Sequence, residues 1–234
     1  MTTNTVPEPQ VTPTGAMLRT LGLVSAICGL IIVGAYHGTY SAVQANKKLA
    51  TERAVKSVIP AAQSITEYWL AAGGSLGVAK SGDLPVGAIK FYAGYDVEGK
   101  LNGIAAEGGA KGYADVVRVM YGYSPKCQCI NGFSIVSSRE TPGIGDKVDA
   151  SKSNADKDFL ANFKALDAKL NVNKTALANE IRAVKHGTKT SPWQIDAISG
   201  ATITSRAVAN GINDSAKALL PKLTPNLDTI RSKP

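Results

Sequence analysis

The chain has 234 residues, which allows one ordinary domain and an anchor but leaves no room for a second large domain. Hydrophobic residues make up 44% and charged residues 19%, proportions typical of a folded protein and not of a disordered one. The formal net charge is +8, but lysines and arginines scatter from Lys47 to Lys233 without a dense block. This pattern excludes the usual nucleic-acid-binding classes and fits an anionic membrane surface or an acidic partner better.

The N-terminal part predicts a tail followed by a membrane helix. Residues 1–16 hold three prolines among threonines and lack apolar periodicity, which predicts a flexible tail. From Thr20 to Ala45 there is no charged residue, and the apolar stretch with its flanks approaches the roughly 20 residues that span a bilayer. The alternative is a cleaved signal peptide ending near Val43-Gln44-Ala45, although the stretch is long for one. We therefore predict a single transmembrane helix.

The flanks of this helix give conflicting signals about orientation. Only Arg19 immediately precedes it, whereas four cations follow it: Lys47, Lys48, Arg53 and Lys56. Charge counting alone places the following domain inside the cell, but this rule weakens for long domains. Residues 46–59 are rich in helix formers and end before Pro60, so we expect the helix to continue beyond the membrane, giving an anchor with its extension over residues 17–59.

The next part of the chain predicts an antiparallel sheet. Between Thr66 and Pro85 the pattern suggests a short helix followed by a loop. Runs rich in Val, Ile, Tyr and Phe, separated by turn residues, then predict a meander of about four strands. These runs are residues 88–96, 101–107, 116–123 and 130–137.

Helical patterns follow the strands. Apolar spacing predicts helices over residues 158–170, 175–184 and 205–220, the last ending at Pro221. Strands first and helices later indicate an α+β fold, with an antiparallel sheet and packed helices. We expect one domain over residues 60–223 and a C-terminal tail over residues 224–234.

Cysteines and histidines give little sign of a metal or catalytic site. Cys127 and Cys129 form a CxC pair without a second pair or a nearby histidine, so we expect no metal and interpret them as two small strand or loop residues, with a metal or redox role as the alternative. His37 adjoins the apolar helix and His186 lies among lysines, so no nucleophile arrangement is convincing. We predict no catalytic residue.

One motif carries a chemical signal: Asp-Ala-Ile-Ser-Gly-Ala-Thr-Ile-Thr-Ser over residues 196–205. Its small residues let the backbone approach a bulky anion, and its hydroxyls lie at the start of a helix whose free N–H groups favour phosphate. The alternative is a plain helix cap, in which Asp196, Ser199 or Ser205 satisfies backbone donors and nothing binds.

Two segments carry a resemblance to a known family. Asp196-x-x-Ser-Gly-Ala-Thr202 resembles the recognition motif of the flavin transferase that esterifies FMN phosphate onto a threonine. The segment Glu-Thr-Pro-Gly-Ile-Gly over residues 140–145 resembles a segment of the FMN-binding subunits of the Rnf and sodium-pumping NADH:quinone oxidoreductase complexes. The resemblance covers about Pro60 to Leu220 plus the anchor, although Ser138 stands where the family usually has histidine.

The resemblance implies roles for particular residues. It implies that FMN is bonded covalently to Thr202, with Ser199, Gly200, Ala201 and Thr204 as neighbours of its phosphate. It also implies that Glu140, Thr141 and Gly143 contact the flavin ring or shape its loop. Asp196 is expected to serve the transferase during attachment, or simply to cap a turn, because a carboxylate would repel the finished phosphodiester.

The implied function is electron carriage in a larger assembly. The resemblance to the G subunit of the Rnf complex implies a relay of electrons between ferredoxin and NAD through partner membrane subunits, coupled by them to sodium or proton movement. It implies a single-pass protein of the bacterial inner membrane, with its domain on the periplasmic side, matured by the flavin transferase. Two alternatives stay open: the C subunit of the sodium-translocating NADH:quinone oxidoreductase, and a non-catalytic membrane-tethered binding module.

Overall fold

The computed structural model describes residues 14–79 and 84–233. Residues 1–13, most of the predicted tail, lie outside the described residues. The chain divides into two compact units, Met1–Leu49 and Ala50–Pro234. The boundary falls within a helix, because the extension predicted for residues 46–59 is continuous with the apolar segment.

Helix α1 spans Thr14–Val58 and is long and apolar enough to cross a membrane. Large apolar side chains along its N-terminal part, such as Leu30 and Ile32, are exposed, as a lipid-facing helix requires. The helix already includes Thr14, so residues 14–16 are not part of a tail. It ends two residues before Pro60, because a proline disfavours the helical conformation of the preceding residue.

The last turn of α1 belongs to the second unit and packs on its sheet. Val55, Val58 and the following Ile59 are buried together with Tyr92, Ala105 and Met120. The carbonyl oxygen of Val58 lies so close to Gly122 that a Cβ there would come within 2.3 Å of it. The absence of a side chain at Gly122 therefore permits this close packing.

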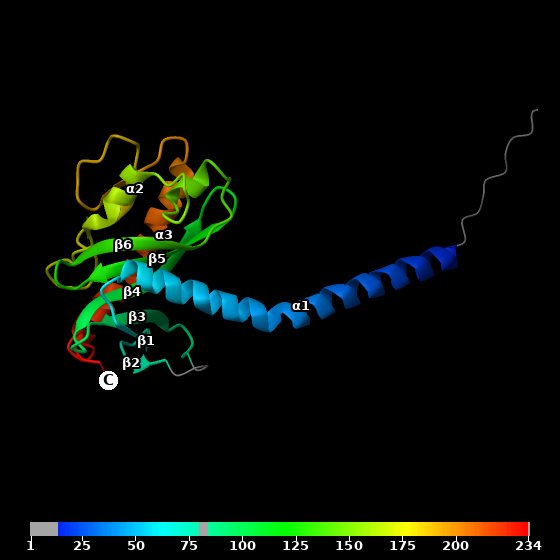
Figure 1. Cartoon of the computed structure of the whole chain (residues 1–234), viewed down its shortest axis with the longest axis horizontal. Helices are drawn as coiled ribbons and strands as arrows, with labels where there is room; N and C mark the ends of the chain where they lie inside the picture. Colours follow the sequence, from blue (N-terminus) through cyan, green and yellow to red (C-terminus); the bar gives the residue numbers. More distant parts are fainter. Residues whose placement is uncertain (1–13, 80–83, 234) are drawn as a thin grey trace, which may run out of the picture. The chain divides into compact units, whose positions relative to one another are not determined.

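The second unit is built on an antiparallel sheet in the order β2-β1-β3-β4-β5-β6-β7 within the described residues (Figure 1). The predicted four-strand meander is confirmed as β3 to β6, and all neighbours in the sheet are antiparallel. The strands are β1 (Ser64–Leu70), β2 (Leu76–Val78), β3 (Ile89–Tyr95), β4 (Leu101–Lys111), β5 (Val116–Ser124), β6 (Cys129–Ser137) and β7 (Leu166–Asp167).

The prediction of a short helix after Thr66 is wrong. This segment forms the hairpin of β1 and β2 instead. Tyr68 and Leu70 alternate toward the core, and the ring of Trp69 on the opposite face covers Gly77 of β2. The hydroxyl groups of Tyr68 and Tyr95 are 2.9 Å apart, linking β1 to β3. Pairing with strands distant in sequence therefore overrides the weak local helix pattern.

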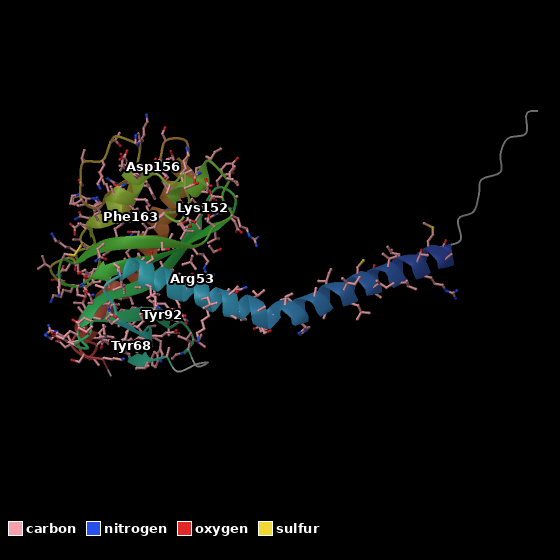
Figure 2. All side chains as sticks on the ribbon, viewed as in Figure 1. Arg53, Tyr68, Tyr92, Lys152, Asp156 and Phe163 are labelled. Atoms are coloured by element: carbon pink, nitrogen blue, oxygen red, sulfur yellow. A yellow bond between two sulfur atoms is a disulfide. The ribbon has the colours of Figure 1, made fainter. Side chains whose placement is uncertain are left out.

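The predictions of helices over residues 158–170 and 175–184 are wrong for most of these residues. The first is reduced to α2 (Lys157–Ala161), capped by the carboxylate of Asp156, and the 3-10 helix η2 (Asn162–Lys164) (Figure 2). The chain leaves helical geometry because Leu166 pairs with Ile130 of β6. The second is a loop ending in β8 (Arg182–Val184), which pairs in parallel with β9 (Gln194–Asp196). A short 3-10 helix, η1 (Gly145–Val148), precedes α2.

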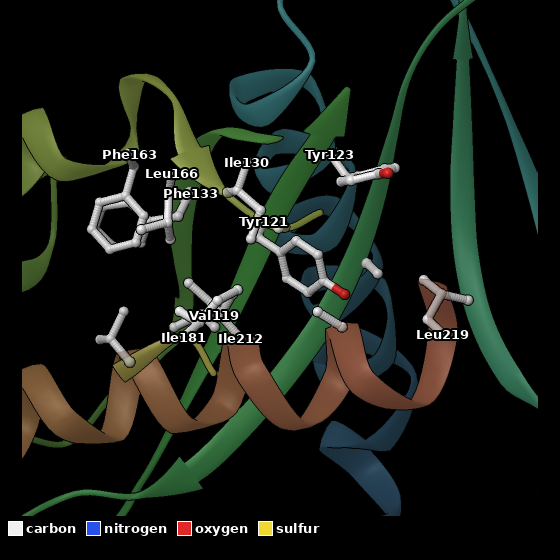
Figure 3. Close-up of a cluster of buried hydrophobic side chains, with 14 of the residues drawn as sticks. Val119, Tyr121, Tyr123, Ile130, Phe133, Phe163, Leu166, Ile181, Ile212 and Leu219 are labelled. Atoms are coloured by element: carbon white, nitrogen blue, oxygen red, sulfur yellow. The ribbon is translucent and has the colours of Figure 1, made fainter. Parts of the chain in front are cut away.

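Helix α3 (Thr202–Leu223) confirms the predicted C-terminal helix and lies on β4 and β5. Its apolar face, including Ile212 and Leu219, packs against Val119 and Tyr121 (Figure 3). The prediction that this helix ends at Pro221 is wrong. The helix continues to Leu223, because Leu220 and Leu223 are buried in the core and stabilise the last turn.

The C-terminal segment is part of the domain and not the free tail that was predicted. A 3-10 helix, η3 (Thr224–Asn226), follows α3 directly, and Ile230 is fully buried. The N–H of Leu101 donates to the carbonyl of Arg231, and the N–H of Lys233 donates to the carbonyl of Gly99. The buried isoleucine and these backbone bonds fix the segment beside the start of β4.

We expect Gly108→Ala to destabilise the protein by about 3 kcal/mol, because overpacking a closed core contact forces the backbone apart. A Cβ at Gly108 would come within 2.1 Å of the carbonyl oxygen of Gly211 in α3. The matched control is Gly109→Ala, where the nearest atom would be 3.5 Å away. Denaturant unfolding of the detergent-solubilised chain measures both, and equal losses would contradict this account of the packing.

Candidate functional site

A cavity of about 560 Å³ opens where three segments of the second unit meet. These segments are the β4–β5 loop, the loop after β6 and the first turn of α3. Its volume lies within the range of small-molecule sites. The lining residues are Tyr113, Glu140, Thr141, Ile144, Gly145, Gly200, Ala201, Thr202, Ile203 and Thr204.

The N-terminus of α3 presents free donors at this cavity. Ala201 occupies the cap position without a side-chain hydrogen bond, and no acidic residue lies in the first turn. The N–H of Ser205 donates to the carbonyl of Ala201, but within residues 14–79 and 84–233 no acceptor serves the N–H groups of Thr202, Ile203 and Thr204. Free donors and the positive end of the helix dipole favour an anion such as phosphate.

Thr202 lies at the cavity, and its hydroxyl does not hold the fold. Thr202 is the first residue of α3, is half-buried and lines the cavity. In the part of the chain that the structure describes, its hydroxyl takes part in no side-chain hydrogen bond, so it is not committed to holding the fold. Gly200, two residues before Thr202, has φ +81°, a conformation that favours glycine and turns the chain into the helix.

Ser205 holds the loop and does not face a ligand. It is fully buried; its hydroxyl accepts from the N–H of Ile198 at 3.1 Å and donates to the carbonyl of Ala201 at 3.0 Å. Ser205 therefore satisfies a backbone donor, as the helix-cap alternative for this motif expected of it. Its hydroxyl fixes the turn that leads into α3.

Glu140 ties two sides of the cavity together. Its carboxylate accepts from the N–H groups of Ala114 at 3.0 Å and Tyr113 at 3.3 Å, and from the hydroxyl of Thr204. Burial alone would raise the pKa of Glu140, but the Thr204 hydroxyl and the N–H groups of residues 113–115 outweigh it and lower the pKa. Glu140 and Thr204, predicted as separate contacts of a ligand, thus bind each other, and Thr204 has its hydroxyl directed at Glu140.

Two glycines leave room for this carboxylate. A Cβ at Gly112 would come within 2.5 Å of Oε1 of Glu140, and one at Gly145 within 2.8 Å of its Cβ. Gly145 lines the cavity together with Ile144 and Ile203, three residues that the sequence interpretation did not single out. Ile144 and Gly145 lie inside the Glu-Thr-Pro-Gly-Ile-Gly segment, and Ile203 lies inside the motif over residues 196–205. Their positions within these two motifs are the feature of the sequence from which they could have been predicted as site residues.

The other residues of the Glu-Thr-Pro-Gly-Ile-Gly segment shape the loop. Thr141 lines the cavity, and its carbonyl accepts from the N–H groups of Ile144 at 3.2 Å and Gly145 at 3.0 Å. Gly143 has φ +78° in this turn and does not belong to the cavity lining. Of these residues, Thr141 is the one placed to contact a ligand.

Asp196 and Ser199 do not belong to the cavity lining. The carboxylate of Asp196 accepts from the N–H of Gly187 at 2.8 Å and lies 3.6 Å from Nδ1 of His186. Its backbone N–H and carbonyl both bond the side-chain amide of Asn162, at 3.0 and 3.3 Å. Asp196 thus caps a turn, one of its two expected roles, and Ser199 is exposed next to Gly200.

The CxC pair differs from its sequence interpretation. Cys127 and Cys129 are joined by a disulfide and are not two independent small residues. Proximity in the β5–β6 hairpin brings the two sulfur atoms together. Among the described residues, no group of three or more His, Cys, Asp or Glu side chains is placed to hold a metal ion.

Comparison with known proteins links this site to a family. The FMN-binding domain family matches residues 112–217, which include both motifs. The chain is 28% identical to the G subunit of the ion-translocating oxidoreductase complex of Haemophilus influenzae (strain PittEE), over 86% of this chain and 87% of the relative. It is 26% identical to the protein of that name from Methanosarcina acetivorans, over 85% and 90%. It is 35% identical to the G subunit of the Na(+)-translocating ferredoxin:NAD(+) oxidoreductase complex of Acetobacterium woodii, over 56% and 55%.

Two solved structures share the fold. NqrC of Shewanella oneidensis superposes with a TM-score of 0.54 at 19% identity, covering 72% of this chain and 84% of that one. The C subunit of the Na(+)-translocating NADH-quinone reductase of Parabacteroides distasonis superposes with a TM-score of 0.60 at 17% identity, covering 78% and 96%. At these identities they establish the fold alone, whereas the curated relatives are named as G subunits. The chain is therefore similar over most of its length to G subunits of ion-translocating oxidoreductase complexes, and residues 112–217 match the FMN-binding domain family.

Proposed function

We propose that this chain is the electron-carrying subunit of a membrane-bound, ion-translocating ferredoxin:NAD oxidoreductase, with FMN bonded through its phosphate to the hydroxyl of Thr202. The relatives named as G subunits of such complexes support the assembly. The observation that carries the proposal is the uncommitted Thr202 hydroxyl at the uncapped N-terminus of α3, inside the cavity.

The residues present fit FMN. The phosphate would take the N–H groups of Thr202, Ile203 and Thr204, which have no acceptor within the described residues, and the positive helix end would offset its charge. The cavity volume of about 560 Å³ suits a cofactor of this size. The exposed apolar side chains of Tyr113 and Ile144, together with Ile203, supply an apolar lining for the flavin ring.

In the proposed mechanism the protein holds and orients the group, and FMN when bound supplies one-electron redox chemistry. The ester to Thr202 retains the cofactor, while Glu140 keeps the β4–β5 loop and α3 in place around it. Asp196 and Ser199 lie outside the cavity lining, and the motif that contains them resembles the recognition motif of a flavin transferase, so their proposed role is in attachment during maturation. The redox activity then belongs to the complex, and this chain has no separate active site.

We also propose that the domain lies on the extracytoplasmic side of the bacterial inner membrane, among the other membrane subunits. The disulfide supports this side, because disulfides persist in oxidising compartments. The cations after the apolar segment favour the opposite side, but that rule has little force for a domain as long as residues 50–233.

One experiment tests both attachment and side. The chain is produced together with a flavin transferase, sealed spheroplasts are treated with protease, and the released peptides are analysed by mass spectrometry. We expect the Thr202 peptide in the medium, heavier by FMN less one water. An FMN-bearing peptide found only after lysis would refute the orientation, and its absence from both fractions would refute the covalent link.

A further inference from the structure

The disulfide lies at the tip of the β5–β6 hairpin, in the exposed loop that connects the two strands (Figure 2). Cys127 is exposed, whereas Cys129 is 8% exposed and begins β6 opposite Ser124 of β5. The residue between them, Gln128, has φ +52°, a conformation that non-glycine residues rarely adopt. The bridge therefore has one accessible and one buried sulfur.

Such a bridge does little to hold the fold. A disulfide stabilises mainly by restricting the unfolded chain, and this effect grows with the length of the closed loop. Here the two cysteines are separated by only two positions, and the hairpin pairing between Ser124 and Cys129 already brings the loop ends together. The residue enclosed by the bridge, Gln128, lies in the left-handed region. Disulfides that are exposed and add little stability are the ones that exchange readily.

The bridge is also far from the flavin cavity. Strand β5 runs from Val116, next to the cavity loop, to Ser124, next to the bridge. At about 3.3 Å per residue, this separates the two sites by roughly 26 Å. The bridge therefore does not belong to the flavin site and needs a function of its own.

We propose that Cys127 and Cys129 form a thiol–disulfide exchange site that accepts two electrons from a dithiol protein. The partner's thiolate attacks the exposed sulfur of Cys127, the bond between Cys127 and Cys129 breaks, and Cys129 leaves as a thiolate that takes up a proton. The partner's second thiolate then attacks its own sulfur in the mixed disulfide and releases Cys127, which is protonated. The partner becomes the disulfide, so two electrons and two protons have moved to this chain.

The surroundings of the bridge suit an incoming thiolate. Lys126 next to Cys127 is exposed and gives the loop a positive charge that attracts an anion. Cys129 pairs with Ser124 of β5 and with Asp167 of β7, and the carboxylate of Asp167 accepts from the N–H of Lys169. The acidic residue thus lies on the strand that pairs with the buried cysteine, while the cation flanks the exposed one.

The test uses the full-length chain in detergent, carrying Cys28→Ser to remove the third cysteine. The folded protein is incubated with increasing dithiothreitol, quenched with a maleimide and analysed by intact mass. We expect two maleimides to be added without denaturant, with the melting temperature lowered by less than about 3 °C. Reduction that requires unfolding, a larger loss of melting temperature, or two free thiols before any reductant is added would each overturn the proposal.

Two single variants identify the attacked sulfur. Cys129→Ser leaves the exposed thiol and Cys127→Ser leaves the buried one, and each is allowed to react with an aromatic disulfide reagent that releases a coloured thiolate. We expect the Cys129→Ser variant to react at least tenfold faster. Equal rates would overturn the assignment of Cys127, and the titration of the unsubstituted bridge decides the proposal if either variant fails to fold.

Discussion

Replacing Thr202 with valine is expected to abolish covalently bound flavin while leaving a folded, membrane-bound chain. Valine keeps the shape and branching of threonine but has no hydroxyl to esterify. Stability should change by less than about 1 kcal/mol, because a surface substitution that breaks no contact costs little. The Thr202 hydroxyl has no hydrogen-bond partner within the described residues and is only half-buried. The measurement is flavin fluorescence of the protein band in a denaturing gel.

The matched variant is Thr202→Ser, which restores a hydroxyl at the same position and should recover a fluorescent band. Both variants are produced with the same flavin transferase and compared at equal protein amounts. A band of normal fluorescence from the valine variant would place the flavin on another residue. Loss of the folded protein in the valine variant would show that the side chain has a structural role that its contacts do not indicate.

Replacing Glu140 with alanine is expected to lower the free energy of unfolding by about 4 kcal/mol and the melting temperature by roughly 10 °C. The change leaves the N–H groups of Tyr113 and Ala114 and the hydroxyl of Thr204 without their acceptor. Each buried donor left unsatisfied costs about 1–3 kcal/mol, and water reaching the exposed Tyr113 loop recovers part of this. The control is Glu98→Ala in an exposed turn, for which we expect little change.

The stabilisation by Glu140 should depend on pH in a defined direction. The folded chain lowers the pKa of Glu140 below the ordinary 4.5, so the ionised carboxylate is the form that the fold favours. Its contribution is complete above pH 4.5 and is lost as the pH falls below that value through the folded pKa. The stability deficit of Glu140→Gln, measured by denaturant unfolding, should therefore shrink in that range. A deficit that stays constant would show that charge plays no part.

The site was predicted in part. The motifs led to Thr202, Gly200 and Thr141, because a hydroxyl or glycine at a fixed offset from a helix start or turn is a local property. The bond between Glu140 and Thr204 could not be predicted in this way, since 64 positions separate the two residues and only the packing of α3 on the sheet brings them together. The cysteine bridge was missed because a two-residue spacing has no local signature of pairing.

The sequence by itself determined the apolar helix, the meander of β3 to β6 and helix α3. The first is a long uncharged apolar stretch, the strands are runs rich in β-branched and aromatic residues between turns, and α3 has a helical apolar spacing. Only the tertiary structure decided the strands β1, β2, β7 and β8 and the place of the C-terminal segment. In those short segments the local preference is weak, and hydrogen bonds and burial against distant parts of the chain outweigh it. The cavity depends on the same long-range packing, so the motif in the sequence pointed to Thr202 and the fold supplied the walls around it.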